Sequence, residues 1–542
     1  MNINKHSVLH SALALAVMAL SASVSAAPAA AKTSPTAGSQ AVIVAYKAGM
    51  AAAVRSEVES AGGKIVRELG RASAFAVRIP ASRLAALQAS ANVDFVEPDA
   101  ERRLLGFQTR TMDATAQPLA TAVDVGSLPG EVLPYGITMV QANKVHDAYT
   151  GNRKLCIIDS GFDRTHPDLA GNNANTTGIN LTEPISGTWD SDVNSHGSHV
   201  AGTIAALGGN GIGVVGVNPG GKLKLHIAKV FGADGGASSS AVMAAVASCA
   251  DAGANIISMS LGGGDPSQAE RRVFRSLLND GVLSIAAAGN AGDTSTSYPA
   301  GYEEVMSVGA LDANMVRAGF SQVNNDVEIA APGVATLSTI PPNLGSLGQL
   351  SVGGAAYDAA GMDGSPRLTA MAALHDFGLG TAIDNAASGK VCLIKRGVVS
   401  FATKVLNCQN SGGVAAVIYN NRPGMLFGTL GGVATSIPSI GTSDVIGATL
   451  KGMPGQSATV SVVPDPALYA YFNGTSMATP HVSAVAALVW SHFPKCSAKQ
   501  IRQVLNASAM EIGRPGKDPE FGFGLTQAKA AYDRLAATGC GN

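Results

Sequence analysis

A serine among small residues, directly before a long apolar run, is the first candidate for chemistry in this chain. Ser476 lies within Asn-Gly-Thr-Ser-Met-Ala-Thr-Pro-His at residues 473–481, and the apolar residues beyond it predict a helix. Small neighbours leave room for a reacting carbonyl group, and the positive end of a helix favours a negative charge that develops beside it. Serine and glycine also cap helices without any chemical role, so this stretch alone does not identify a nucleophile.

Three further polar residues lie at the ends of predicted elements. Asp159 ends the strand-like apolar run 155–158, His196 begins a helix of small residues, and Asn290 follows the buried-strand pattern 284–288. Active sites of parallel α/β sheets form at strand ends and in the adjoining loops. Each residue also has a purely structural interpretation, because aspartate and asparagine form turns and the backbone can satisfy a histidine at a helix start.

Together these residues have the complementary chemistry that acyl transfer requires. A serine hydroxyl is a poor nucleophile unless a base takes its proton, and His196 is the candidate base because imidazole titrates near neutral pH. Asp159 would hold the imidazole in the required tautomer. Asn290 would donate its side-chain N–H to an oxyanion, with the Ser476 backbone N–H as the second donor. We therefore predict an Asp-His-Ser triad, and we expect Thr475 to support the same site.

The chain order Asp, His, Ser is that of the subtilisin arrangement. At these residues the chain resembles the subtilisin-like serine proteases, or subtilases, over roughly residues 133–342 and 467–537. The resemblance implies a serine endopeptidase that hydrolyses peptide bonds of protein or peptide substrates through an acyl-enzyme. Strand and helix patterns alternate to about residue 339, which predicts an α/β fold with a parallel doubly wound sheet.

Two other motifs suggest different enzymes. The glycines of residues 211–216 fit the dinucleotide fingerprint, but they follow a predicted helix, whereas the fingerprint should follow a strand and begin a helix. Residues 474–478 approach the nucleophile elbow of α/β-hydrolases, which place the acid and the histidine after the serine. His481 and His492 belong to the predicted helix or its end, so no such pair follows the serine.

The resemblance also implies residues that hold the substrate. Ser260, Leu261 and Gly262 resemble the extended strand that aligns the substrate backbone. Ala291 and Ser297 resemble pocket positions, and both are small and uncharged. We therefore predict a preference for large apolar or aromatic side chains immediately before the cut bond.

A structural calcium ion is a second implication of the resemblance. Asp168 resembles a family calcium ligand, and the loop 207–214 resembles the partner loop, although it is about one residue longer than the family pattern. Oxygen ligands of this kind are those that calcium prefers. The implied set consists of the side chains of Asp168 and Asn210, the carbonyl groups of Leu207, Ile212 and Val214, and Glu131 to complete it.

The N-terminal part reads as a secretion signal followed by a small domain. Basic residues precede the apolar run 8–20, and small residues near 24–26 offer a cleavage site, which predicts a signal peptide at residues 1–26. Residues 41–103 show the order β-α-β-β-α-β, which is ferredoxin-like. This domain resembles the inhibitory propeptide of subtilases, which assists folding and occupies the cleft; a permanent N-terminal domain is the alternative. We expect an irregular tether at 104–130 and cleavage within 103–120.

The remaining chain is expected to contain one catalytic domain in two parts. The first part covers residues 131–342 and the second covers 465–542, and residues 343–464 are inserted between them. The insertion is rich in glycine and short strand patterns, and its segments 390–397, 401–405 and 414–421 resemble the β-rich protease-associated (PA) domain. An insertion between the oxyanion asparagine and the nucleophile should lie near the cleft, where it would limit or recruit substrates.

Six cysteines in a secreted chain predict disulfide bonds. We expect Cys392 to pair with Cys408 inside the insertion, and Cys496 with Cys540 at the C-terminal tail. Cys156 and Cys249 are left by elimination, and two buried free thiols are the alternative for them.

Composition limits the remaining function classes. Charged residues make up 14% of the chain and the net charge is −1, which gives no reason to expect nucleic-acid binding. After the signal peptide no segment resembles a membrane span, so we expect a secreted, extracellular protein. We further expect a monomer, with its own propeptide as the intramolecular inhibitor. A catalytically silent binding protein that uses the inserted domain is the other class considered, and the intact set of four site residues argues against it.

Overall fold

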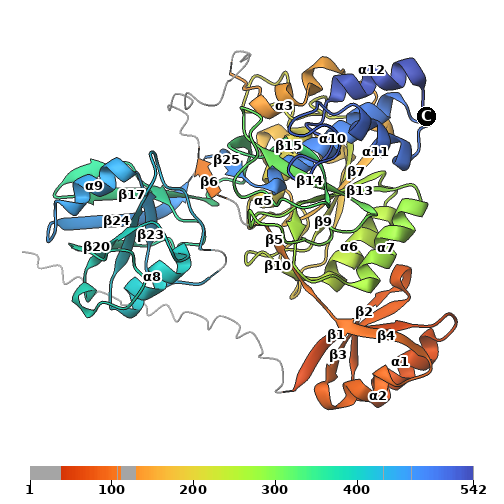
Figure 1. Cartoon of the computed structure of the whole chain (residues 1–542), viewed down its shortest axis with the longest axis horizontal. Helices are drawn as coiled ribbons and strands as arrows, with labels where there is room; N and C mark the ends of the chain where they lie inside the picture. Colours follow the sequence, from red (N-terminus) through yellow and green to blue (C-terminus); the bar gives the residue numbers. More distant parts are fainter. Residues whose placement is uncertain (1–37, 106–107, 112–129, 431–432, 466, 541–542) are drawn as a thin grey trace, which may run out of the picture.

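The computed structural model describes residues 38–105, 108–111, 130–430, 433–465 and 467–540 (Figure 1). The expected signal peptide and most of the expected cleavage region lie outside these residues. Figure 1 shows three parts: a small N-terminal domain in orange, a large α/β body, and a separate domain in teal and blue on the other side of the body.

Seven parallel strands form the central sheet of the body, in the order β15-β14-β13-β11-β7-β9-β8. This arrangement confirms the predicted doubly wound sheet, whose ligands bind where the strand order reverses, at the carboxyl ends of the strands. The strands are β7 (Lys154–Asp159), β8 (Thr176–Asn180), β9 (Lys224–Lys229), β11 (Ile256–Met259), β13 (Leu283–Ala287), β14 (Val305–Leu311) and β15 (Val327–Pro332).

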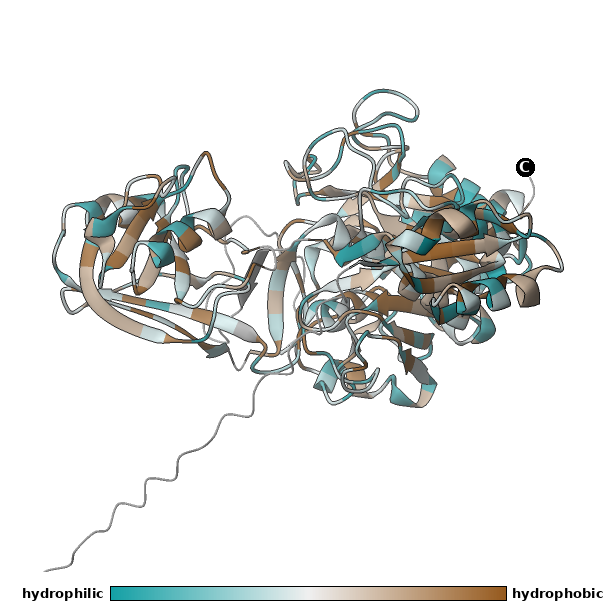
Figure 2. Cartoon of the chain, turned by 90° about the horizontal axis from the view of Figure 1, so that it is seen from below, coloured by the Kyte–Doolittle hydropathy of each residue, from teal (hydrophilic) through white to brown (hydrophobic). Residues whose placement is uncertain are grey.

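Helices cover both faces of this sheet. Leu155 and Ile157 of β7 pack in one core cluster with α5 and α10, whereas Cys156 and Ile158 pack in another with α6 and α7, as the period of two along a strand requires. Figure 2 shows hydrophobic residues concentrated in the strands at the centre of the body. The helices of the body are α3 (Tyr135–Met139), α4 (Pro167–Ala170), α5 (His196–Ala205), α6 (Ser239–Asp251), α7 (Gln268–Asn279), α10 (Thr475–His492), α11 (Ala498–Ala507) and α12 (Ala528–Thr538).

The N-terminal domain is the predicted ferredoxin-like unit. Its antiparallel sheet has the order β2-β3-β1-β4, and the helices lie between β1 and β2 and between β3 and β4. A short 3-10 turn at Ala81–Arg83 precedes the second helix, α2. The elements are β1 (Ser39–Tyr46), α1 (Ala51–Ser60), β2 (Lys64–Leu69), β3 (Ala74–Pro80), α2 (Leu84–Gln88) and β4 (Val93–Pro98).

The inserted segment forms an eight-stranded sheet of its own, with the order β18-β17-β24-β20-β21-β22-β23-β19. Separate hydrophobic clusters lie within it, so this domain does not depend on the core of the body. The elements are β17 (Gly345–Val352), β18 (Ala355–Tyr357), β19 (Ala360–Gly361), β20 (Thr369–Asp376), β21 (Val391–Lys395), α8 (Phe401–Asn410), β22 (Ala415–Tyr419), β23 (Ser439–Thr442), α9 (Asp444–Lys451) and β24 (Ser457–Asp465).

The described residues of the expected irregular tether, residues 104–130, include extended segments that pair with the body. Strand β5 (Glu101–Leu104) lies between β10 (Gly236–Ser238) and β12 (Leu261–Gly262) of the body, and pairs antiparallel with both. A few residues later β6 (Gln108–Thr111) pairs with β25 (Tyr469–Asn473), which also pairs with β16 (Thr336–Thr339). The sequence alone does not reveal these strands, because their pairing partners lie far away in the chain.

Two carboxylates of the N-terminal domain contact helix starts of the body. Glu97 accepts hydrogen bonds from the backbone N–H groups of Gln268 (2.9 Å) and Ala269 (3.1 Å) at the start of α7. Asp99 accepts one from the Ser240 N–H at 2.9 Å, at the start of α6. Negative charge is stabilising at these helix ends, so the N-terminal domain supplies part of the capping of both helices.

Three disulfide bonds use all six cysteines. They join Cys392 to Cys408, Cys496 to Cys540, and Cys156 to Cys249, so the alternative of two buried free thiols is not what the structure contains. The last bond links β7 to α6 on one face of the sheet. Among the described residues there is no helix with the length and hydropathy needed to span a bilayer.

Candidate active site

Asp159 and His196 meet at the carboxyl end of the central sheet. Asp159 is the last residue of β7 and His196 is the first residue of α5. The Nδ1–H of His196 donates to Oδ1 of Asp159 at 2.8 Å, and both side chains are fully buried. This bond fixes the tautomer that leaves Nε2 as the proton acceptor.

Two glycines allow β7 and α5 to approach closely enough for this contact. Gly161 has φ +127°, and a Cβ there would lie 2.3 Å from the carbonyl oxygen of Ser191. A Cβ on Gly197 would lie 2.3 Å from the carbonyl oxygen of Gly161. A side chain on Gly197 would therefore push the histidine helix away from the end of β7, and one on Gly161 would displace the loop that precedes this helix.

Asp192 is a supporting residue that sequence reasoning missed. Its Oδ1 accepts hydrogen bonds from the Ser160 hydroxyl (2.9 Å) and from the Ser195 N–H (3.0 Å). Its Oδ2 accepts from the Ser198 N–H at 2.8 Å, in the first turn of α5. Asp192 thus connects the residue after Asp159 to the residues on both sides of His196. Its position four residues before a candidate catalytic histidine was the available signal.

Ser476 is the second residue of α10, a helix that is buried along almost its whole length. Its hydroxyl donates to the Ser260 carbonyl oxygen at 3.2 Å, and the Ser260 hydroxyl donates to the Ser476 carbonyl oxygen at 2.7 Å. These reciprocal bonds join the start of α10 to the residue before β12. The predicted nucleophile and the predicted substrate-aligning strand are therefore direct neighbours.

Asn290 is oriented by Thr475. Its Oδ1 accepts from the Thr475 N–H (2.9 Å) and from the Thr475 hydroxyl (2.8 Å), so its Nδ2 is directed elsewhere. A Cβ on Gly474 would lie 3.2 Å from Asn290 Nδ2 and 3.5 Å from the Ser476 backbone nitrogen. Both predicted oxyanion donors thus lie close to the same glycine.

Two other buried histidines have structural partners instead. The His199 ring stacks on Phe472 at 4.1 Å between ring centroids, and its Nε2 contacts the carbonyl oxygens of Thr336 and Ala470. The Nδ1–H of His481 donates to the Met477 carbonyl oxygen one helical turn back. Burial lowers the pKa of His199 to about 3 and that of His481 to about 4, so both are neutral near pH 7.

Strand β5 occupies the groove that the predicted substrate-binding residues form. Leu261 pairs with Leu104 and Gly262 pairs with Arg103 in antiparallel register. The next residue, Leu105, lines a cavity of about 470 Å³ together with Gly263, Asn290, Ala291, Ser297 and Thr429, among others. The structure therefore places Ala291 and Ser297 around an apolar side chain, next to the predicted oxyanion donor.

The inserted domain contributes to the same cavity through Thr429. The Thr429 hydroxyl donates to Oδ2 of Asp363 at 3.0 Å, and both residues belong to that domain. Burial raises the pKa of Asp363, while the electrostatic influence of His196 works in the opposite direction. The inserted domain thus reaches the cleft, as its position between Asn290 and Ser476 suggested.

The predicted calcium ligands lie together around one loop. Glu131 and Asp168 are buried carboxylates, and Oε2 of Glu131 has no hydrogen-bond partner among the described residues. The Asn210 N–H contacts Glu131 at 3.3 Å, and its Nδ2 donates to Asp168 Oδ1 at 2.7 Å. The Val214 N–H donates to Asp168 Oδ2 at 2.9 Å.

This donor set fits a calcium ion if the side-chain amide of Asn210 turns over. Two neighbouring buried carboxylates repel each other unless a cation lies near them, and oxygen ligands suit calcium. The Asn210 amide nitrogen faces Asp168, while its oxygen accepts from the Ile212 N–H at 3.1 Å, so this amide would have to turn over to offer its oxygen. The described residues contain no cluster of three or more His, Cys, Asp or Glu, so carbonyl oxygens such as those of Leu207, Ile212 and Val214 would have to complete the set.

Comparisons with known proteins agree with this geometry. The subtilase family model matches residues 151–360 and 445–524, more than half of the chain. A PA domain model matches residues 355–450, and a putative peptidase inhibitor domain model matches residues 17–99.

The chain is similar to subtilisin DY of Bacillus licheniformis, with 38% identity over 39% of this chain and 77% of the relative. It is also similar to subtilisin BL of Lederbergia lenta, with 42% identity over 39% of this chain and 75% of the relative. The crystal structure of the subtilisin-like protease Apa1 of Pseudoalteromonas sp. AS-11 matches with a TM-score of 0.54 and 40% identity, over 76% of this chain and 100% of that one. The chain therefore belongs to the subtilase family of serine endopeptidases, and it carries an inserted PA domain and an N-terminal inhibitor domain.

Proposed function

We propose that this chain is a secreted, self-processing zymogen whose endopeptidase activity depends on Asp159, His196 and Ser476. The observation that carries the proposal is the path of its own chain through the cleft. Strand β5 pairs with the strand that starts after Ser260, and Leu105 lines the same cavity as Asn290. A substrate of the mature enzyme would bind along the same strand.

The proposed reaction assigns one role to each of these side chains. The Ser476 hydroxyl attacks the carbonyl carbon of the cut bond while Nε2 of His196 takes its proton. Asp159 stabilises the imidazolium through the 2.8 Å bond to Nδ1. The negative oxygen receives hydrogen bonds from Asn290 Nδ2 and the Ser476 N–H. His196 then protonates the leaving amine, and water releases the acyl group by the same steps in reverse.

The domain limits form part of the proposal. Residues 1–26 would direct secretion, and residues 41–103 would be the propeptide that inhibits the enzyme until it is removed. Residues 131–342 and 465–542 would make the catalytic domain, and 343–464 the PA domain. Three disulfide bonds suit an oxidising compartment, which supports an extracellular location.

We also propose a structural calcium ion at Glu131, Asp168 and Asn210, with carbonyl oxygens of the loop 207–214 as further ligands. Its contribution would be stability rather than catalysis, because a bound ion neutralises two buried carboxylates and holds the loop against the segment that carries Glu131. None of the catalytic steps above involves the ion.

Intact mass of the purified protein tests the proposal directly. Wild type and Ser476→Ala are produced side by side without a co-expressed protease, and each is also assayed on a quenched peptide that contains Leu-Gly. We expect wild type to lose its N-terminal domain and to cleave the peptide, and Ser476→Ala to keep that domain and be inactive. Two full-length, inactive proteins would instead support the silent binding protein, and an active Ser476→Ala protein would refute the assigned nucleophile.

A further inference from the structure

A second subsite in the occupied groove is acidic and deeply buried. We infer that Glu270 selects an arginine three residues before the residue in the Leu105 position, so that the enzyme prefers Arg-x-x-Leu before the cut bond. The chain's own Arg102-Arg103-Leu104-Leu105 is then its first substrate, cut between Leu105 and Gly106. This inference rests on the proposed function, because it concerns the specificity of the same site.

Arg102 and Glu270 form a doubly hydrogen-bonded ion pair. Nη2 of Arg102 lies 2.6 Å from Oε2 of Glu270, and Nε lies 3.1 Å from Oε1, with both side chains fully buried. The remaining guanidinium contacts are backbone oxygens, those of Glu101 and Asp265, each at 3.0 Å. A buried ion pair is favourable only when its hydrogen bonds are satisfied in this way. Burial works to lower the pKa of Arg102, but Glu270 more than offsets it and the net direction is upward.

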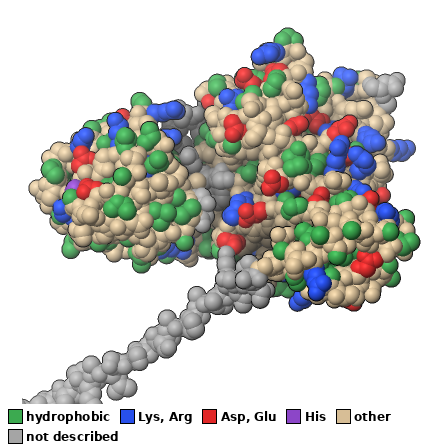
Figure 3. Space-filling view, turned by 60° about the horizontal axis from the view of Figure 1, so that its bottom comes forward, with side chains coloured by type: hydrophobic (Ala, Val, Ile, Leu, Met, Phe, Trp, Pro, Cys, Tyr) green, Lys and Arg blue, Asp and Glu red, His purple; other side chains and the backbone are tan. Residues whose placement is uncertain are grey.

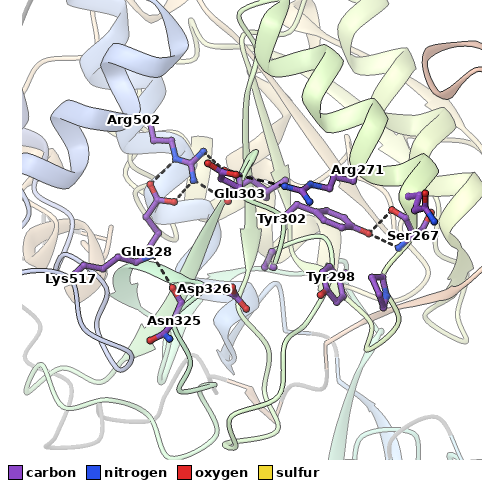
Figure 4. Close-up of a pocket in the computed structure, with 15 residues that line it drawn as sticks. Ser267, Arg271, Tyr298, Tyr302, Glu303, Asn325, Asp326, Glu328, Arg502 and Lys517 are labelled. Atoms are coloured by element: carbon purple, nitrogen blue, oxygen red, sulfur yellow. Dashed lines mark hydrogen bonds and ion pairs between the residues drawn. The ribbon is translucent and has the colours of Figure 1, made fainter.

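The body holds Glu270 in place independently of Arg102. Glu270 lies in the first turn of α7, and its N–H donates to the hydroxyl of Ser267, the cap of that helix, at 3.1 Å. The Tyr302 hydroxyl contacts both Glu270 Oε2 (2.9 Å) and the Ser267 carbonyl oxygen (3.1 Å). Figure 4 shows Tyr302 directed at Ser267 on the wall of an adjoining cavity. After the N-terminal domain leaves, a carboxylate held by the body therefore remains in the groove without its cation.

Strand register connects this subsite to the primary pocket. Arg102 pairs with Ala237 on one side of β5, and Leu104 pairs with Leu261 on the other. A Cβ on Gly263 would lie 2.4 Å from the Glu101 carbonyl oxygen and 3.1 Å from Arg102 Nη1, so this glycine is what allows the arginine to enter. Any extended peptide whose side chain fills the Leu105 cavity in this register brings its third preceding residue to Glu270.

Neighbouring residues on the chain provide a matched control. Arg103 is the next residue, but its side chain is 54% exposed and pairs with Glu101 of its own strand. Glu303 is an acidic residue of the same region whose side chain is 90% exposed. Arg103 has the same charge as Arg102, and Glu303 has the same charge as Glu270. Only Arg102 and Glu270 are buried in the subsite, so Arg103 and Glu303 serve as controls of equal charge.

The first experiment compares two peptides on the mature enzyme. One contains Glu-Arg-Arg-Leu-Leu-Gly-Phe-Gln, and the other has citrulline, which is isosteric and neutral, in place of the first arginine. Because charged hydrogen bonds contribute about 1.5–3 kcal/mol, we expect kcat/KM to be roughly 10- to 100-fold higher for the arginine peptide. Glu270→Gln should reduce this ratio to near one and still cleave the citrulline peptide, and Glu303→Gln should keep the wild-type ratio.

Equal kcat/KM values of wild type for both peptides would overturn the inference but leave the proposed function intact. Cleavage of neither peptide would instead refute the proposed function. The ratio of the two kcat/KM values measured with the wild-type enzyme tests the selection of arginine even if Glu270→Gln does not fold.

The second experiment follows self-processing. Arg102→Gln should slow the appearance of a mature protein that begins at Gly106, whereas Arg103→Gln should mature at the wild-type rate. A mature N-terminus at another bond, or equal slowing by the two substitutions, would show that Arg102 only anchors the N-terminal domain.

Discussion

At the scale of single residues, the direction of the Asn290 amide depends on Thr475. Both the N–H and the hydroxyl of Thr475 hold the Asn290 oxygen, so the amide nitrogen is directed away from Thr475, as the predicted oxyanion donor requires. Because Thr475 would act through Asn290, we predict that it is a positioning residue. Its effect should appear in the transition state, where the oxyanion develops, rather than in substrate binding.

We therefore expect Thr475→Val to lower kcat roughly tenfold with little change in KM. The loss should be smaller than the about 10²–10³ that removal of an oxyanion donor causes, a value measured in a subtilisin. Steady-state kinetics on a short peptide with leucine before the cut bond measure both constants. Thr203→Val is the control, because the Thr203 hydroxyl contacts only the His199 carbonyl oxygen within α5. An increase in KM with unchanged kcat would contradict the positioning role.

How far the sequence predicts the site depends on how local each residue's role is. Asp159, His196, Asn290 and Ser476 each lie at or close to the end or the start of an element, so their local sequence identifies them as candidates. Glu270 reads as an ordinary polar residue near a helix start, since its partner Arg102 lies 168 positions away. Asp192 is missed for a related reason, because its function is to hold backbone groups of other residues.

At the scale of elements, the strands and helices of the body follow from hydrophobic periodicity, and β5 and β6 do not. Strand β7 alternates between two cores, which its apolar run already indicates. Strand β5 contains Glu-Arg-Arg-Leu, a sequence with little intrinsic preference for a strand. It is extended because β10 and β12 present open edges on both sides of it, and such long-range pairing leaves no local pattern.

The loop 207–214 is the element on which the calcium proposal depends. We expect chelation with EGTA to lower the Tm of the Ser476→Ala protein, in which self-digestion is prevented, by about 5–15 °C. Asp168→Asn should have a lower Tm in calcium and no response to the chelator. Asp518→Asn is the control, because Asp518 contacts only its own turn, through the N–H groups of Arg514, Glu520 and Phe521.

Differential scanning fluorimetry with calcium and with EGTA gives this readout without an activity assay. An unchanged Tm of the parent protein after chelation would rule the ion out, and the buried carboxylates would then need another explanation.

At the scale of the whole molecule, three parts meet at one cleft. The N-terminal domain supplies the chain that occupies it, the body supplies the predicted catalytic residues, and the inserted domain supplies Thr429 to the wall of the Leu105 cavity. Lys and Arg side chains are interspersed with Asp and Glu on the face drawn in Figure 3, so charge there is mixed. The arrangement suggests that the inserted domain restricts which substrates enter.

Removal of the inserted domain tests this restriction. Its ends are adjacent, because Thr339 of β16 pairs with Tyr469 of β25, so a short turn can replace the chain between them. We expect the deletion to change cleavage of a folded protein such as lysozyme at least severalfold more than cleavage of an octapeptide. The parent enzyme with Thr429→Ala separates loss of one side chain from loss of the domain. Equal effects on protein and peptide would argue against restriction of substrates.

The contacts of Glu97 and Asp99 have a consequence for the life of the mature enzyme. The proposed maturation would remove the carboxylates that contact the starts of helices α6 and α7, while Ser238 and Ser267 would remain as caps. The full-length chain would then fold with these contacts in place, and the mature product would have to persist without them. Its survival is then governed by the height of the barrier to unfolding rather than by an equilibrium, and a molecule that once unfolds has no template with which to return.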